Sequence, residues 1–257
     1  MSLKSNLSHI NLLTTPGVVA ISTCRGCVIE GNSYSGFNAC HYTGDTDEHV
    51  AQCRGQLCVM LGIERDNLII PRQTHSLNVA IIDTIPFDSQ KLENVDALVT
   101  TLPRVAIAIN TADCVPLVFV DDVNKVIGVA HSGWKGTVGR IASKTVERMI
   151  ECGASLSHIK VAMGPCICGD CFEVGPEVVA QFVENGFDSS QVILSHYQPR
   201  PHIDLPHACR QALIEVGVLD KNIQLPTHCS RCNPQKFFSA RRLGINSGRT
   251  LTVVMMK

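Results

Sequence analysis

The chain has 257 residues, of which 45% are hydrophobic and 18% are charged, a balance typical of a globular protein with an ample core. Its formal net charge of −1 gives no electrostatic reason to expect nucleic-acid binding. No segment approaches the roughly 20 apolar residues of a membrane span, and the N-terminus lacks the apolar stretch and cleavage site of a signal peptide. We therefore expect a cytoplasmic protein that does not enter a membrane.

The predicted elements mix strands and helices irregularly along the chain. Strands are expected at 18–23, 28–30, 68–82 with a turn near residue 75, 105–110, 117–120, 126–130, 159–163 and 251–255. Helices are expected from Asp45 or Thr46 to Gly62, and over 137–152, 176–184 and 205–216. The runs between 105 and 130 are apolar and β-branched, as in strands buried on both faces. No repeat or linker interrupts them, so they predict one α+β domain over residues 1–257 with mixed β-sheets.

Three potential metal ligands stand at predicted strand-to-turn junctions: His75 in IIPRQTHSLNV, Cys114 in AIAINTADCVPLVFV and His131 in VIGVAHSGWKG. Two imidazoles and one thiolate suit zinc, and three protein ligands leave the fourth tetrahedral position for a reactant. If these side chains converge, the chain is a metal-dependent hydrolase or transferase. Asp113, which adjoins Cys114, could orient a ligand or carry a proton.

Two other chemistries use the same atoms. Copper also binds two histidines and a cysteine, but blue-copper sites add a weak axial ligand, commonly Met, and none is evident near these motifs. The sequence contains no His-x-His pair of the kind that multicopper oxidases use. Cys114 and His131 could instead form the nucleophile and base of a cysteine hydrolase. That hypothesis leaves His75 without a role, and we rank it below the zinc site.

The chain has thirteen cysteines, which should be thiols in a reducing compartment. Cys24–Cys27 and Cys229–Cys232 form CxxC pairs, and a third cluster comprises Cys166, Cys168 and Cys171. Zinc ribbons join their CxxC pairs over some 15–20 residues, whereas about 200 residues separate these two pairs. We therefore expect these cysteines to be small buried apolar residues and not ligands of a structural zinc.

Two segments could bind an anion. The loop MGPCICGDCFEVG opens onto a predicted helix, whose N-terminal amides favour negative charge, although a structural turn is the simpler interpretation. FFSARRLGINSGR carries Arg241, Arg242 and Arg249, whose guanidinium groups could clamp a phosphate or could be solvated at the surface. Trp134, the single tryptophan, could stack on a planar ligand or pack in the core.

Taken together, these motifs resemble the YfiH family, also described as laccase-domain, polyphenol oxidase or peptidoglycan-editing proteins. QTHSLNV resembles its Q-V-H-G segment, NTADCVPLVFVD its A-D-C-x-P segment and HSGWKGTVGRI its H-A-G-W-[RK]-G segment. MGPCICGDCFEVG and FFSARRLGINSGR are similar to its two later motifs. The five motifs occur in the family's order and span nearly the whole chain.

The resemblance implies a layered α/β/β/α fold in which His75, Cys114 and His131 bind zinc, or copper as the alternative metal. It implies phosphorolysis of adenosine, inosine and methylthioadenosine, and deamination of adenosine. Hydrolytic editing of peptidoglycan precursors and oxidation of polyphenols are alternative activities of the family. On this basis Asp113 would transfer protons in deamination, and Arg241, or alternatively Arg25, would hold phosphate. The residues expected to contact the substrate are Arg25, Asn38, Arg54, Trp134 and Arg242.

The chain departs from the family pattern at three places. The pattern T-x-R-x-G-G-V-S appears as TCRGCVIE, which keeps Arg25 and loses the two glycines and the serine. Cys53 replaces the asparagine that precedes Arg54, and Ser76 stands where glycine usually follows the first histidine. These positions fall where the substrate is expected to touch the site, whereas the three proposed metal ligands are kept.

Overall fold

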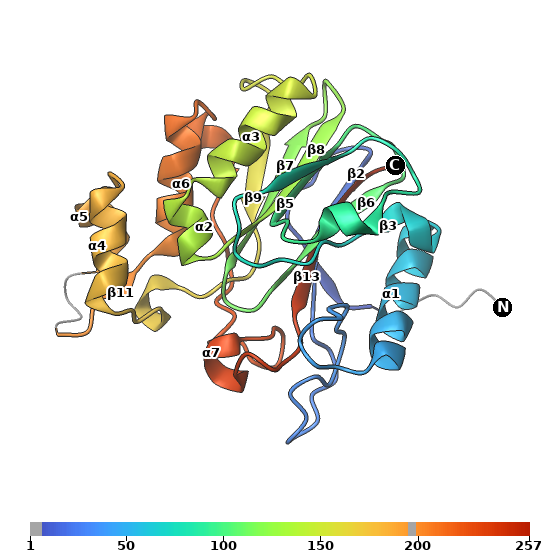
Figure 1. Ribbon diagram of the computed structural model, residues 1–257, viewed down its shortest axis with the longest axis horizontal. Coiled ribbons are helices and arrows are strands. Elements are labelled where there is room, and N and C mark those ends of the chain that lie inside the picture. The colour runs from blue at the N-terminus through green and yellow to red at the C-terminus, as the bar shows by residue number, and fades with distance from the viewer. Residues whose placement is uncertain (1–6, 195–198) are drawn as a thin grey trace.

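The structure is a computed structural model and describes residues 7–194 and 199–257. Two β-sheets pack face to face, with helix α1 on the outer face of one sheet and helices α3 and α6 on the outer face of the other (Figure 1). The α/β/β/α layering implied by the family resemblance is thus confirmed. In the described parts of the chain, no helix has the length and apolar character that crossing a membrane requires.

The first sheet has five strands in the order β1-β2-β13-β6-β3. Its strands are β1 (His9–Asn11), β2 (Val18–Thr23), β13 (Thr250–Met256), β6 (Ala106–Thr111) and β3 (Leu68–Ile69). Only the short β3–β6 pairing is parallel, and the other neighbours are antiparallel. The strand that ends the chain therefore lies at the centre of this sheet.

The second sheet has six strands in the order β12-β9-β7-β8-β5-β4. Its strands are β12 (Ile223–Gln224), β9 (Lys160–Met163), β7 (Val115–Asp121), β8 (Val126–Ser132), β5 (Ala97–Thr100) and β4 (Val79–Ile82). The central strands β9, β7, β8 and β5 are antiparallel, and the two edge pairings are parallel. A separate two-stranded pair comprises β10 (Ile193–Leu194) and β11 (His202–Ile203).

Strand β7 shows why the buried strands are apolar on both faces. Leu117 and Phe119 point toward the helices and join a core cluster that includes Val146 of α3 and Leu213 of α6. Val118 and its neighbours on the same face join a second cluster between the two sheets. Because each face of the strand meets a different hydrophobic layer, the usual alternation of polar and apolar residues is absent, as predicted.

The helices are short apart from the three that cover the sheets. Their bounds are α1 (Asp47–Leu61), α2 (Trp134–Val138), α3 (Ile141–Glu151), α4 (Pro176–Glu184), α5 (Ser189–Val192), α6 (Leu205–Glu215) and α7 (Ala240–Leu243). Thr46 caps α1 by accepting a hydrogen bond from the His49 amide, and Gly62 ends the helix with a left-handed φ of 67°. Both ends of α1 agree with the prediction.

Three predicted elements differ from the structure, and some short elements were not predicted. The strand expected over 68–82 is limited to β3 (Leu68–Ile69) and β4 (Val79–Ile82), which belong to different sheets. Residues 28–30 form no strand, because they lie in a loop between Gly26 and Gly31, both with positive φ. The helix expected over 137–152 is divided into α2 and α3, because Arg140 adopts a left-handed φ of 62° between them. Strand β5 was not predicted; four residues are too few to show a pattern, and its pairing with β4 and β8 defines it.

Candidate metal centre and active site

Strand register brings Cys114 and His131 to the same end of the six-stranded sheet. Cys114 immediately precedes β7, and His131 is the sixth residue of β8. In the antiparallel β7–β8 pairing, His131 lies opposite Pro116, two residues from Cys114. The neighbouring strand β5 begins one residue after Asp96, whose carbonyl accepts the His131 amide hydrogen at 2.8 Å. Three segments distant in sequence therefore meet at this edge.

The third predicted ligand, His75, is held there by the buried carboxylate of Asp96. This carboxylate accepts hydrogen bonds from the backbone amides of Thr74, His75 and Ser76 at 3.1, 3.1 and 2.7 Å. His75 adopts a left-handed φ of 61°, an uncommon conformation for a residue with a side chain. The three amide contacts stabilise that turn and direct the imidazole toward Cys114.

The donor atoms of the three ligands fit a zinc ion. The Cys114 Sγ lies 3.7 Å from His75 Nε2, and one donor atom from each of the three residues lies within 4.8 Å of the others. Zn–N and Zn–S bonds of about 2.0 and 2.3 Å at tetrahedral angles would separate such atoms by roughly 3.5 Å. His131 offers Nε2, because its Nδ1 faces the Asp96 carboxylate at 2.7 Å. The convergence predicted from the sequence is therefore present.

Gly133 lies directly against two of these ligands. A Cβ at this position would stand 2.7 Å from His75 Cδ2 and 2.9 Å from Cys114 Sγ, well inside ordinary contact distance. Its φ of −73° is accessible to any residue, so the conformation does not require glycine. The close approach of the His75 and Cys114 side chains, however, does require glycine at this position.

The electrostatics of the site favour a thiolate. Burial would raise the pKa of Cys114, but the charge of His131 and hydrogen bonds from both histidines lower it to about 6. Burial would lower the pKa of His131, but the Cys114 thiolate and the Asp96 carboxylate raise it to about 9. The thiolate is the form of cysteine that binds zinc. The same pair would suit a cysteine hydrolase, but His75 shares the site, and metal binding gives it a role.

Asp96 is a candidate functional residue that the sequence analysis did not predict. It is fully buried, and burial alone would raise its pKa, but hydrogen bonds from His131, Ser76 and Thr74 lower that pKa to about 2. A carboxylate behind a metal-binding histidine fixes the ring orientation and raises its basicity. The available signal was an acidic residue directly before the apolar run ALVT, but nothing in that segment indicated its neighbours.

Asp113 and Arg241 are brought together beside the triad. The Asp113 carboxylate accepts hydrogen bonds from Ser230 Oγ at 2.6 Å, Ser239 Oγ at 3.0 Å and the Arg241 amide at 2.7 Å. The Arg241 guanidinium is exposed; it donates to the Glu173 carbonyl at 3.0 Å and lies 5.5 Å from the Phe172 ring. Asp113 therefore joins the turn that carries Cys114 to the start of α7.

Arg242 and Trp134 are both at least partly accessible to solvent. Arg242 is exposed and donates to the Arg231 carbonyl at 3.3 Å. Trp134 begins α2, three residues after His131, and is partly buried against the helix-side core. Lys135 stacks over its ring at 5.6 Å. Trp134 thus packs in the core on one side and remains partly accessible on the other.

The remaining predicted substrate residues are engaged with the protein. Arg25 is 3% exposed, stacks on Phe238 at 4.7 Å and donates to the Ser35 carbonyl at 3.0 Å. Arg54 donates to the Ala39 carbonyl at 2.9 Å and contacts His41 Nδ1 at 2.8 Å. A substrate role for either arginine stays a prediction.

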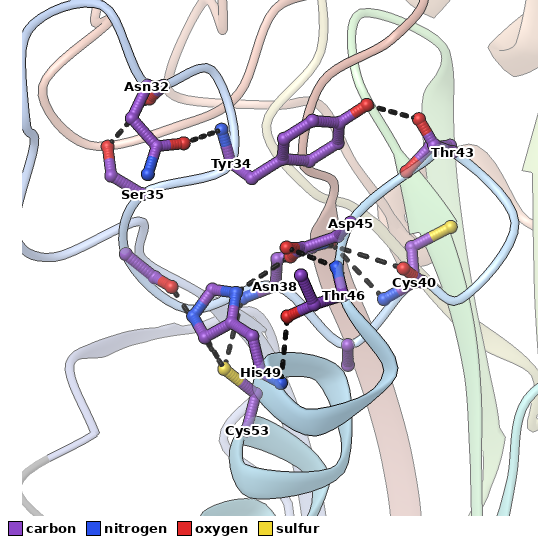
Figure 2. Close-up of polar contacts among 12 residues, drawn as sticks. Asn32, Tyr34, Ser35, Asn38, Cys40, Thr43, Asp45, Thr46, His49 and Cys53 are labelled. Carbon is purple, nitrogen blue, oxygen red and sulfur yellow. Dashed lines mark hydrogen bonds and ion pairs between the residues drawn. The ribbon is translucent and has the colours of Figure 1, made fainter.

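Asn38 lies in a polar network at the start of α1, away from the solvent (Figure 2). Its amide donates to Asp45 Oδ2 at 2.7 Å, and its carbonyl oxygen accepts from the Arg249 amide at 3.0 Å. Asp45 also contacts His49 Nδ1 at 2.7 Å, and His49 Nε2 lies 3.6 Å from Cys53 Sγ. The network connects the loop before α1 to the C-terminal segment, and contact of Asn38 with substrate stays a prediction.

The expectation for the CxxC cysteines was wrong in one respect. Cys168, Cys171, Cys229 and Cys232 are partly or fully exposed and form a second group whose sulfur atoms all lie within 4.8 Å of one another. The first CxxC pair, Cys24 and Cys27, is not part of this group. The long separation between the two CxxC pairs was misleading, because Cys229–Cys232 does not meet Cys24–Cys27. Chain folding instead brings Cys168–Cys171 next to Cys229–Cys232.

Comparison with known proteins agrees with this fold and site. A family model described as multi-copper polyphenol oxidoreductase laccase matches residues 19–257. The chain is 49% identical over 248 residues to adenosine deaminase RL5 from an unknown prokaryotic organism, covering 94% of this chain and 95% of that protein. It is 37% identical over 266 residues to a purine nucleoside phosphorylase of Bacteroides thetaiotaomicron, covering 100% and 94%.

Solved structures give the same result. The Bacillus licheniformis hypothetical protein YfiH superposes with a TM-score of 0.86 and 26% identity over 93% of each chain. YlmD from Geobacillus stearothermophilus superposes with a TM-score of 0.84 and 26% identity over 94% of this chain and 93% of that one. The family match, the ordered motifs and the shared architecture lead to one conclusion: the chain belongs to the YfiH family, the multi-copper polyphenol oxidoreductase laccase family of the matching model.

Proposed function

We propose that the protein is a zinc-dependent purine nucleoside phosphorylase, acting on adenosine, inosine and methylthioadenosine, that also deaminates adenosine. The observation that carries the proposal is the convergence of His75, Cys114 and His131 on one partly exposed site. The names of its relatives, adenosine deaminase and purine nucleoside phosphorylase, supply the reaction classes. Its small-molecule partners would be a purine nucleoside and phosphate.

In this proposal His75 Nε2, Cys114 Sγ and His131 Nε2 hold the metal. Zinc with three protein ligands supplies a Lewis acid and lowers the pKa of water at its open position to about 7. Asp96 keeps His131 in the tautomer that presents Nε2 outward, and its contacts with residues 74–76 keep His75 in place. These residues position the ligands before the substrate arrives, so little rearrangement is needed.

Arg241 and Asp113 are proposed to serve the two reactions differently. The exposed guanidinium of Arg241 would hold phosphate as it attacks the anomeric carbon of the ribose, giving the free base and ribose 1-phosphate. Asp113 would move the proton that accompanies attack of water on C6 of adenine, giving inosine and ammonia. Because Asp113 accepts the Arg241 amide, its substitution would also displace Arg241. Arg25, Asn38, Arg54, Trp134 and Arg242 remain proposed substrate contacts.

The test is product analysis with adenosine in the presence and absence of phosphate. Phosphate-dependent formation of adenine and ribose 1-phosphate, with phosphate-independent formation of inosine, would support both activities. His75→Ala should abolish both, whereas His9→Ala, at an exposed histidine on β1, should leave them unchanged. Zinc-loaded protein that converts neither adenosine nor inosine would refute the proposal.

A copper-dependent polyphenol oxidase is the second candidate, favoured by the description of the matching family. The same three ligands could hold copper. Oxygen consumption with a phenol, dependent on copper and lost in His75→Ala, would support this activity. The thirteen cysteines, all within the described residues, form no disulfide, which supports the cytoplasmic location that we propose.

A further inference from the structure

Two turns, far apart in sequence, bring four cysteines together near Asp113, which contacts Ser230 of the second turn. Cys168 precedes and Cys171 ends the 3₁₀ turn Gly169–Cys171, and Cys229 and Cys232 flank Ser230 and Arg231. The sulfurs of Cys171 and Cys232 are 3.4 Å apart, and the Cys168 amide donates to the Cys229 sulfur at 3.4 Å. The four sulfur atoms all lie within 4.8 Å of one another.

The backbone holds both turns in this arrangement without the sulfurs. Cys166 and Cys229 form a parallel β-bridge, in which the Ser230 amide donates to the Cys166 carbonyl at 2.8 Å. Within the turns, the Cys171 amide donates to the Cys168 carbonyl at 3.0 Å, and the Asn233 amide donates to the Cys229 carbonyl at 3.1 Å. Each CxxC therefore forms a tight loop, and the two loops face each other.

We propose that Cys168, Cys171, Cys229 and Cys232 bind a second zinc ion in a closed, structural site. Four thiolates at Zn–S distances of about 2.3 Å stand roughly 3.8 Å apart at tetrahedral angles, a separation compatible with four sulfurs that all lie within 4.8 Å of one another. Four protein ligands leave no position for a reactant, unlike the His75–Cys114–His131 site. Arg231, which lies between Cys229 and Cys232 in the second turn, would offset part of the negative charge of four thiolates.

The position of this site gives it a structural consequence. Ser230 lies between two of its ligands and donates to the Asp113 carboxylate at 2.6 Å. The Ile167 amide, next to the other turn, donates to the Asp113 carbonyl at 2.9 Å. The zinc would hold both loops in contact with Asp113, the residue before the proposed metal ligand Cys114. It would thereby stabilise the turn that carries Cys114.

Metal content of the purified protein tests the proposal. Wild type, His75→Ala, the pair Cys171→Ser with Cys232→Ser, and Cys27→Ser are purified under reducing conditions after growth with zinc. We expect two zinc ions per chain in wild type and in Cys27→Ser, an exposed cysteine outside the cluster. We expect one in His75→Ala and one in the paired variant. Unchanged zinc in the paired variant, or iron in place of zinc, would overturn the proposal.

Cobalt substitution gives a second readout that leaves all four cysteines intact. His75→Ala loaded with Co²⁺ should show the intense thiolate-to-cobalt charge transfer and the visible absorption of a tetrahedral four-thiolate site. A spectrum without these bands would overturn the proposal even if the paired variant fails to fold. Neither measurement depends on the nucleoside reactions, so loss of this site and failure of the proposed function are distinguishable.

Discussion

Gly133→Ala should disable the candidate metal centre while leaving the fold intact. The added Cβ would stand 2.7 Å from His75 and 2.9 Å from the Cys114 sulfur, about 1 Å inside ordinary contact distance. His75 cannot easily retreat, because Asp96 holds the backbone of residues 74–76. Metal ligands tolerate displacements of only about 0.2 Å. We therefore expect zinc affinity to fall by at least about 100-fold. This is the upper end of the loss seen when a residue that positions a metal ligand is substituted.

The assay is competition for zinc with a chromophoric chelator, beside urea unfolding of the metal-free protein. Overpacking should reduce the free energy of unfolding by about 1–3 kcal/mol, so the variant should remain folded. Gly55→Ala is the matched control: it lies within α1, its added Cβ would meet only the Arg65 side chain at 3.6 Å, and it should stabilise the helix by about 0.5–1 kcal/mol. Wild-type zinc affinity in Gly133→Ala would refute the steric reasoning.

Three further predictions follow from buried groups. Asp96→Asn should weaken zinc binding about 10–100-fold by releasing His131, whereas Asp122→Asn, at a surface ion pair, should leave chelator competition unchanged. Burial would raise the pKa of Asp121, but hydrogen bonds from Asn124 and Ser155 lower it below its ordinary value of 3.8. Asp121 should therefore stabilise the folded protein at pH values above 3.8, and this stabilisation should be lost as the pH falls through its lowered pKa. The unfolding free-energy difference between wild type and Asp121→Asn should therefore shrink from pH 7 to about pH 3; a constant difference would contradict this. Phe119 is fully buried, so Phe119→Ala should lower the free energy of unfolding, measured in urea, by about 3–5 kcal/mol. A decrease below about 1 kcal/mol would contradict this, because it would mean that the surrounding core closes over the missing ring.

Local pattern was sufficient for the long elements. The apolar runs that became β6, β7 and β8 have no polar face, which predicts strands covered on both sides. The capping residue Thr46 and the terminal Gly62 directly adjoin α1, so the signals for both ends of the helix are local. Short elements such as β5 and the break at Arg140 escaped prediction, because packing against neighbouring strands and helices decides them.

The candidate site divides in the same way. Residue type and junction position predicted His75, Cys114 and His131 as metal ligands, since few side chains bind zinc and each follows or ends an apolar run. Asp96 could not be recognised, because its role arises from four hydrogen-bond partners that other strands and turns supply. Gly133 likewise matters only because folding brings two ligands against it.

The sequence by itself determined which segments are buried strands and which side chains can bind a metal, because both follow from hydrophobicity and donor chemistry within a few residues. Only the tertiary structure decided which cysteines meet: Cys171 and Cys232 are 61 positions apart, and contacts between two loops, not sequence spacing, bring their sulfurs to 3.4 Å from each other. Tertiary folding also engaged Arg25 and Asn38 with protein partners. Contacts between distant segments depend on the register and packing of whole sheets, which no local pattern encodes.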